Sequence, residues 1–344
     1  AVRDINHKYI VVGGNAMCTC ITYKNGDFYF GRNLDLDCSF NESVVLTPRN
    51  FPLEFRKAPK RNTHYAMIGM ASKNDCFPLY AEAVNEKGLC MAGLNFPGNA
   101  YYQKVTESGL ELASFEVIAW FLGECASVED AKKYLKNLSI VDLSFASQMP
   151  AAPLHWMLAD SKECLVLEAV KDGLKVHENP FGVLTNNPPF DYHRMNMVNY
   201  LNLTAQNPEN RFCAGLPLKP YAQGMGAVGL PGDWSSSSRF VRAAFLKENS
   251  HAQQSENANV SQFFHILDNV AMVRGSVITD TGTCDITTYS CCVNTRTGKY
   301  YYRRYDDFMI RTADPLTADL DASSLYWFEE ESQSLPSAID PAIK

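Results

Sequence analysis

The sequence predicts an α+β protein in which antiparallel β-sheets are layered against helices. Two observations support this fold class. Strand-like segments separated by turn residues fill the first hundred positions and return in the second half. Segments with apolar residues at helical spacing occur in pairs between and after these strand blocks. This order suits two antiparallel sheets between helical layers, and the absence of an internal repeat or a linker predicts a single domain.

The first elements are expected to form hairpins. Residues 18–23 and 28–30 resemble two strands, and Asn25-Gly26 between them is a strong turn signal. A second hairpin is expected over residues 79–95, with its turn near Gly88. The remaining segments of this half are strands at 43–47 and 64–71 and an exposed loop at 51–63.

The hydrophobic period becomes helical after residue 109. Apolar residues from Leu110 to Phe121 recur at helical spacing, and Ser127 is the expected N-cap of a second helix that reaches about residue 138. A loop is expected at 139–153. The later elements are strands at 154–160, 164–170, 174–177 and 182–185, helices at 239–246 and 260–271, and a hairpin over 287–304.

Length and composition are those of a globular enzyme and exclude several other classes. The 344 residues can bury a large core, and the 46% hydrophobic content lies in the globular range. A net charge of -7 without a Lys/Arg cluster argues against a nucleic-acid partner. No apolar run approaches the roughly 18 residues that a membrane-spanning helix needs, so no membrane association is expected.

The eleven cysteines do not form a metal-binding pattern. No CxxC pair has a partner His or Cys at zinc-site spacing, so we expect neither a metal nor another cofactor. Scattered thiols are typical of a reducing compartment, which predicts a cytoplasmic protein. Cys20 shares a strand face with Cys18, so it is either a buried core residue or a neighbour of a site built on Cys18.

Cys18 is the candidate nucleophile. A thiol needs a base, and no His or acid within a few positions is placed to serve. If Met17 and the residues before it were removed, Cys18 would carry a free α-amine with a pKa of about 7.7–8.0, which suits a general base. The first hairpin would also bring the cation of Arg32 and the carboxylate of Asp35 beside Cys18.

The first 17 residues leave two possibilities open. The apolar run Tyr9-Ile10-Val11-Val12 is shorter than the 7–15 residues of a secretory signal core. We expect Met17 to be the natural start of a cytoplasmic protein, with a cleaved pro-segment as the alternative. In both cases residues 1–17 are an extension that is removed to expose Cys18, and residues 18–344 form the functional domain.

Five motifs, in order, resemble those of a known family. The chain is similar to the choloylglycine hydrolases, also called conjugated bile salt hydrolases, which belong to the N-terminal-nucleophile hydrolases. The resemblance extends from Cys18 to about Tyr305. It rests on Cys18-Thr19, FGRNLD ending at Asp35, AGLNFPG around Asn95, GVLTNNPPFD around Asn186, and VGLPGDWSSSSRF containing Arg239.

The resemblance implies a four-layer αββα sandwich and a site built on an N-terminal cysteine. In this family the backbone N–H matching Asn95 and a side-chain amide hold the oxyanion, and we assign the amide to Asn186 rather than Asn187. Arg32 is expected to lower the pKa of the thiol, because it lies beside the sulfur. The catalytic residues implied are Cys18, Arg32, Asp35, Asn95, Asn186 and Arg239.

The resemblance also implies a substrate and an assembly. The substrate would be a conjugated bile salt, cleaved at the amide that joins the bile acid to glycine or taurine, and the protein would be a homotetramer. The implied pocket residues are Leu34, Phe40, Phe145, Met149 and Leu154. Penicillin V acylase is the related alternative, although its members more often carry an aromatic residue where this chain has Asn95. An unprocessed, inactive binder of amphipathic ligands is the second alternative.

Overall fold

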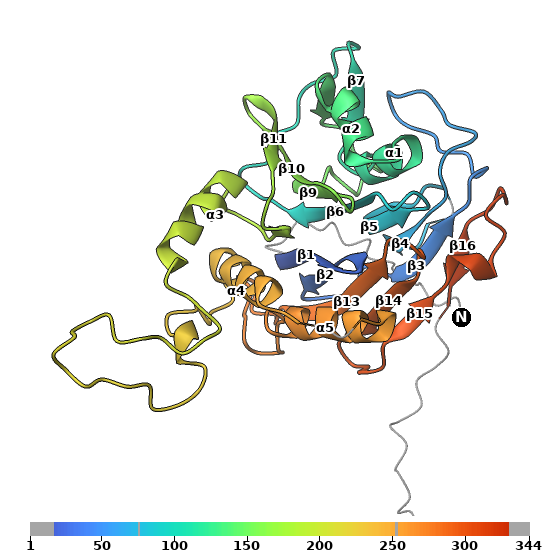
Figure 1. Cartoon of the computed structure of the whole chain (residues 1–344). Helices are drawn as coiled ribbons and strands as arrows, with labels where there is room; N and C mark the ends of the chain where they lie inside the picture. Colours follow the sequence, from blue (N-terminus) through green and yellow to red (C-terminus); the bar gives the residue numbers. More distant parts are fainter. Residues whose placement is uncertain (1–16, 75, 252–253, 330–344) are drawn as a thin grey trace, which may run out of the picture.

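Two large antiparallel sheets pack face to face in the computed structural model, which describes residues 17–74, 76–251 and 254–329 (Figure 1). The six-stranded sheet has the order β12 (Val183–Leu184), β1 (Met17–Asn25), β2 (Asp27–Leu36), β13 (Ile286–Asn294), β14 (Tyr300–Arg304) and β15 (Arg311–Ala313). The eight-stranded sheet has the order β11 (Gly173–Glu178), β10 (Cys164–Val170), β9 (Leu154–Ala159), β6 (Cys90–Asn95), β5 (Leu79–Asn85), β4 (Met67–Ser72), β3 (Glu42–Thr47) and β16 (Tyr326–Phe328).

Helices cover the outer face of each sheet, which confirms the predicted αββα sandwich (Figure 1). Helices α1 (Val117–Glu124) and α2 (Val128–Leu135) lie over the eight-stranded sheet. Helices α4 (Ser236–Glu248) and α5 (Glu256–Asp268) lie under the six-stranded sheet. The short helix α3 (Phe190–Asn196) continues into a 3₁₀ turn at Met197–Tyr200, and two further 3₁₀ turns occur at Met225–Ala227 and Pro315–Thr317.

Both sheets are buried on two faces, which explains the long apolar runs in their strands. Phe30, Leu94 and Met157 belong to one core that extends between the sheets and onto α4 and α5. Trp156 and Phe121 belong to a second core between the eight-stranded sheet and the other two helices. Each large apolar side chain buried in this way contributes about 1.5–3 kcal/mol to folding.

The first hairpin forms as predicted. Strands β1 and β2 pair antiparallel from Asn25 opposite Asp27 to Met17 opposite Asp35. Gly26 turns between them with φ of +70°, a conformation that glycine adopts without steric cost. The register is fixed over nine residue pairs, so the turn determines which side chains of β2 lie beside Cys18.

The expected helix that begins at residue 110 was wrong over its first seven residues, 110–116. Leu110–Ala113 is strand β7, and it pairs in parallel with β8 (Leu138–Val141), which lies at the start of the segment expected to be a loop. Apolar periodicity does not report pairing between residues so distant in sequence, so a short buried strand resembled a helical turn. The helix itself begins at Val117.

Other elements differ at their ends or were not expected. The loop at 51–63 is only partly exposed, because Phe51, Leu53 and Ala58 are buried. Strand β4 begins at Met67 rather than 64, and α5 spans Glu256–Asp268 rather than 260–271. The Ser cap of α2 forms as predicted, with Ser127 accepting from a backbone N–H group, and Ser235 caps α4 in the same way. The elements that sequence patterns did not indicate are α3, β15 and β16.

All eleven cysteines are free thiols, and six of them are buried. Within residues 17–74, 76–251 and 254–329, no helix has the length and apolarity needed to cross a membrane.

Gly31→Ala is expected to destabilise the six-stranded sheet. A Cβ at Gly31 would lie 2.0 Å from the Cys291 carbonyl oxygen of β13, so a strand must move. We expect the free energy of unfolding, measured in urea, to fall by about 1–3 kcal/mol or more. Gly232→Ala is the matched control, because a Cβ there meets no atom within 4 Å. Equal stability of the two variants would contradict the close approach of β2 and β13.

Candidate active site

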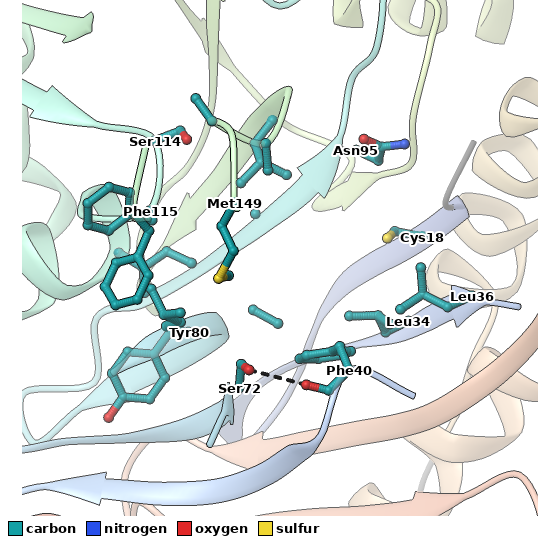
Figure 2. A pocket seen from close by; sticks show the side chains of 18 of the residues that line it. Cys18, Leu34, Leu36, Phe40, Ser72, Tyr80, Asn95, Ser114, Phe115 and Met149 are labelled. Carbon is teal, nitrogen blue, oxygen red and sulfur yellow. Dashed lines mark hydrogen bonds between the residues drawn. The ribbon is translucent and has the colours of Figure 1, made fainter. Parts of the chain in front are cut away.

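Cys18 lies in β1 and lines one end of an apolar pocket (Figure 2). The residue is 3% exposed. The hairpin register puts Leu34 directly opposite Cys18 and places Asp35 and Arg32 on either side of that position in β2. Burial raises the pKa of the Cys18 thiol above its usual value, and Asp35 raises it further, whereas Arg32, the Asn95 backbone N–H and Arg239 lower it.

The pKa of the Cys18 thiol is raised overall, which bears on how the sulfur can react. Arg32 lowers the thiol pKa as expected from the sequence, but burial is the larger effect and the pKa stays raised. The thiol is therefore not ionised by its surroundings at neutral pH. A base must take its proton before the sulfur can attack.

Arg32 is held at the interface of the two sheets. Its Nη1 donates to the carbonyl oxygens of Ala81 (3.2 Å) and Gly93 (2.6 Å), and its Nε lies 3.8 Å from the carboxylate of Glu82. Glu82, itself 1% exposed, also accepts from the hydroxyls of Tyr289 and Tyr300. The guanidinium is thereby fixed near the sulfur.

Glu82 was not among the residues singled out from the sequence. An isolated Glu in an otherwise apolar segment, AEAVN, is a signal that could have drawn attention to it, because buried carboxylates are rare unless paired.

Two asparagines from different sheets meet at the nucleophile. Asn95 ends β6, and Asn186 lies two residues beyond the end of β12. Asn186 Nδ2 donates to the Asn95 carbonyl oxygen (2.8 Å), and its Oδ1 accepts from the backbone N–H of Cys18 (2.8 Å). The neighbouring Asn187 instead donates to the Pro97 carbonyl oxygen (2.6 Å), so Asn186 is the one that contacts Cys18.

Arg239 connects the same two segments from the first turn of α4. Its Nη2 donates to Asn186 Oδ1 (2.9 Å), and its Nη1 donates to Thr19 Oγ1 (2.7 Å) and to the Cys18 carbonyl oxygen. The side chain is fully buried. A cation is disfavoured at a helix N-terminus, and here it is retained by these acceptors.

The two carboxylate oxygens of Asp35 differ in their hydrogen bonding. Its Oδ1 accepts from the Thr287 hydroxyl (2.6 Å), whereas its Oδ2 is buried with no hydrogen-bond partner among the described residues. Burial raises the pKa of Asp35 to about 7, although Arg239, Thr287 and Arg32 lower it. A buried carboxylate oxygen without a donor is costly, so this atom marks a position for a donor.

The apolar pocket extends from Cys18 to a wall of aromatic side chains (Figure 2). Cys18 and Asn95 lie at one end, Tyr80 and Phe115 lie opposite, and Met149 reaches in from the loop before β9. The five side chains proposed from the sequence, Leu34, Phe40, Phe145, Met149 and Leu154, all line it. Leu36, Tyr80, Phe115 and Ile118 also line it and were missed, because their patterns match ordinary core positions.

A second, polar hollow of about 320 Å³ lies on the nitrogen side of Cys18. Met17, Asn186 and Arg239 line it, together with Asp280 and Asp285. The site therefore has an apolar pocket at the Cys18 side chain and a second hollow, lined in part by charged side chains, beside Met17. Cys20 is fully buried in the core and lines neither cavity, so it does not contribute to either wall.

Sequence comparison gives one family and several close relatives. The profile of the linear amide C–N hydrolases of the choloylglycine hydrolase family matches residues 18–328. The bile salt hydrolase/transferase of Lactiplantibacillus plantarum is 46% identical over 318 residues, which cover 92% of this chain and 98% of that protein. The conjugated bile acid hydrolase of Lactobacillus gasseri is 39% identical and covers 86% of this chain and 95% of its own length.

Solved structures agree with this comparison. A variant of the conjugated bile acid hydrolase from Clostridium perfringens matches with a TM-score of 0.84 and 37% identity, covering 91% of this chain and 97% of that one. Penicillin V acylase from Agrobacterium tumefaciens matches with a TM-score of 0.72 at 18% identity, covering 90% of each chain, and so shares the fold.

Replacing Arg32 is expected to raise the pKa of the Cys18 thiol further, because the guanidinium is the largest influence that lowers it. The variant Arg32→Met with Glu82→Gln avoids leaving a buried carboxylate without its cation. Alkylation of the Cys18 peptide by iodoacetamide, followed by mass spectrometry across pH, should shift to higher pH than in the wild-type protein. The exposed Cys213 is the internal control. An unchanged Cys18 profile would contradict the electrostatic role of Arg32.

Proposed function

The chain belongs to the choloylglycine hydrolase family of linear amide C–N hydrolases, and we propose that it hydrolyses the amide joining a bile acid to glycine or taurine. One observation carries this proposal: Cys18 lines an apolar pocket, and its neighbours Met17, Asn186 and Arg239 line a second hollow that carries charged side chains. Conjugated bile salts have the matching division, a rigid apolar steroid on one side of the amide and a charged head group on the other. The names of the relatives that are 46% and 39% identical point to the same substrates.

The base of the reaction is the α-amine of Cys18, produced when residues 1–17 are removed. While Met17 is attached, the Cys18 nitrogen is an amide whose one hydrogen goes to Asn186 Oδ1, and an amide is no base. A free amine has additional hydrogens and a lone pair. Asp35 Oδ2, buried without a donor, would accept one of those hydrogens and direct the lone pair at the sulfur. Residues 18–344 are the functional domain in this proposal.

Acylation begins when the amine takes the thiol proton and the sulfur attacks the amide carbonyl carbon. The oxyanion is bound by the Asn95 backbone N–H, which lies close enough to the sulfur to lower its pKa, and by Asn186 Nδ2. Asn186 Nδ2 has two hydrogens, and only one of them is used by the Asn95 carbonyl. In such sites each donor contributes roughly 2.7–4 kcal/mol to stabilising the transition state.

The amine then returns the proton to the leaving amino acid, and the C–N bond breaks. The leaving group departs through the polar hollow, which the removal of Met17 enlarges. Water entering from the same side loses a proton to the amine and hydrolyses the thioester, and this step releases the bile acid and restores the thiol. Arg32 and Arg239 stabilise negative charge on opposite sides of Cys18.

The substrate is tested by release of glycine and taurine from glycocholate and taurocholate, with penicillin V for comparison. Protein that begins at Cys18 should release the amino acids rapidly and cleave penicillin V slowly. Cys18→Ala should reduce release to the uncatalysed background without changing the thermal unfolding midpoint. Cys20→Ala is the matched control and should keep activity, because Cys20 lies on the same strand but lines neither cavity.

The same assay tests the substrate class and the identity of the base independently. No release by protein whose intact mass confirms an N-terminal Cys18 would overturn the substrate class. Release by protein whose mass shows that Met17 is still attached would overturn the assignment of the α-amine as base, because the Cys18 nitrogen is then an amide.

We also propose that the protein is a homotetramer assembled through an arm, residues 201–235, that projects from the sandwich between α3 and α4 (Figure 1). Asn207 and Asn210 hold the arm together by hydrogen bonds within it. Phe212 and Tyr221 are 88% and 89% exposed on it, and Leu216 and Leu218 are half exposed. An ordered projection with several exposed apolar side chains is typical of a contact surface.

The eleven free thiols support the cytoplasmic location expected from the sequence.

Light scattering on a sizing column tests the assembly. The wild-type protein should have four times the 38.4 kDa chain mass, less any removed extension, and Phe212→Ser with Tyr221→Ser should shift it toward the monomer. Phe308→Ser is the matched control, because Phe308 is also 88% exposed but lies between β14 and β15. A monomeric wild-type protein would overturn the tetramer, and an unchanged double variant would overturn the role of the arm.

A further inference from the structure

The two proposed oxyanion donors belong to different sheets, so their separation depends on what joins the sheets at that point. Asn95 ends β6 in the eight-stranded sheet, whereas Asn186 follows β12 in the six-stranded sheet. A misplacement of about 1 Å in such a site can cost roughly a hundredfold in rate. One buried side chain, His155 of β9, contacts the neighbours of both donors, and its exposure is 0%.

His155 contacts the Asn95 segment through its ring face. The imidazole stacks on Phe96, the residue after Asn95, with a ring-centroid distance of 4.3 Å and an interplanar angle of 7°. The backbone of His155 also pairs with Leu94, the residue before Asn95. The position of the ring is therefore tied to the end of β6.

The ring edge contacts the Asn186 segment. His155 Nε2 donates to the carbonyl oxygen of Thr185, the residue before Asn186, over 3.0 Å. On the other edge, Nδ1 lies 3.4 Å from Glu168 Oε1, and the same carboxylate oxygen accepts from the backbone N–H of Phe190 (2.9 Å). Together His155 and Glu168 hold the chain on both sides of the turn that carries Asn186.

The ring of His155 lies between two acceptors, the Thr185 carbonyl oxygen at Nε2 and the Glu168 carboxylate at Nδ1. Glu168 is 1% exposed. Although burial raises the pKa of Glu168, hydrogen bonds from His155 and His177 bring it to about 2. The carboxylate is therefore ionised at neutral pH.

We propose that His155 and Glu168 are positioning residues that fix the distance between the Asn95 N–H and the Asn186 amide. The inference rests on the proposed function, because it assigns the pair to the same oxyanion site. Neither residue lines the apolar pocket or the polar hollow. Their loss is therefore expected to lower kcat and leave KM near the wild-type value, since transition-state contacts change while the substrate pocket does not.

The test uses a graded set of variants on protein that begins at Cys18. His155→Ala removes both contacts, and we expect kcat to fall by about tenfold to a hundredfold. His155→Gln retains a donor for the Thr185 carbonyl oxygen and should recover part of that loss. Glu168→Gln retains an acceptor for the Phe190 N–H but removes the charge, and its kcat should be intermediate.

His64→Gln is the matched control for the loss of a buried histidine. His64 is also buried, and its two nitrogens lie 2.8 Å from the carbonyl oxygens of Tyr65 and Phe51, far along the chain from either donor. It should lower the thermal unfolding midpoint and leave kcat unchanged. A parallel loss of kcat in His64→Gln and His155→Gln would mean that general destabilisation, and not positioning, causes the effect.

Crystal structures of the wild-type protein and His155→Gln provide a readout independent of substrate. The distance from Asn186 Nδ2 to the Asn95 backbone nitrogen should change in the variant. An unchanged distance, or an unchanged kcat in a wild-type enzyme that hydrolyses conjugates, would overturn the inference. If the wild-type protein hydrolyses no conjugate, the proposed function fails, and the measured distance alone decides whether His155 positions the two asparagines.

Discussion

The hydrogen bond from Asn186 Nδ2 to the Asn95 carbonyl oxygen joins the two sheets at the place where the chemistry is proposed. Asn95 is the last residue of β6, where it pairs with Leu154 of β9, and Asn186 follows the end of β12, so the bond forms where both strands end. The same Asn186 accepts from the Cys18 backbone nitrogen and from Arg239. One amide therefore sets the positions of the nucleophile, its nitrogen and the buried cation relative to each other.

Burial around this amide disfavours the nearby anions but strengthens the interactions between charged and polar groups. It raises the pKa of the Cys18 thiol and of Asp35, which disfavours both anions. It also strengthens each charge–charge and hydrogen-bond interaction, because the local dielectric constant is low. In the proposed mechanism an α-amine at Cys18, with its pKa of about 7.7–8.0, takes the thiol proton, and removal of the preceding residues would supply that amine.

The apolar pocket and the catalytic groups share their structural supports. Leu34 and Arg32 share one face of β2 and both line the pocket, and Asp35 follows Leu34, so one strand supplies the pocket wall and the charges beside the sulfur. Arg32 is in turn anchored by the carbonyls of Ala81 and Gly93, which lie at the pocket as well. Changes to the pocket that move β5 or β6 will also move the guanidinium.

Local residue patterns were sufficient to predict the strands and the turn near Cys18, and the motifs follow in an order that can be read directly. Asn25-Gly26 specifies a tight turn through local backbone preference, so the neighbours of Cys18 on β2 could be predicted. The four-layer sandwich and the five pocket residues followed from the motifs through the family resemblance. Local patterns failed at Leu110–Ala113, because its parallel pairing with β8 is not encoded in a local apolar period.

Which groups meet from the two sheets depends on contacts between residues far apart in the chain. His155 and Glu168 have no local pattern that separates them from other polar residues in strands, and the isolated Glu82 gives no sign of its partner, yet packing of the sheets places each against a charged or aromatic side chain. The net pKa of the Cys18 thiol was likewise decided by burial, which depends on contacts between residues far apart in the chain. Sequence specifies the local geometry, and the close packing of the two sheets determines the electrostatic environment in which it acts.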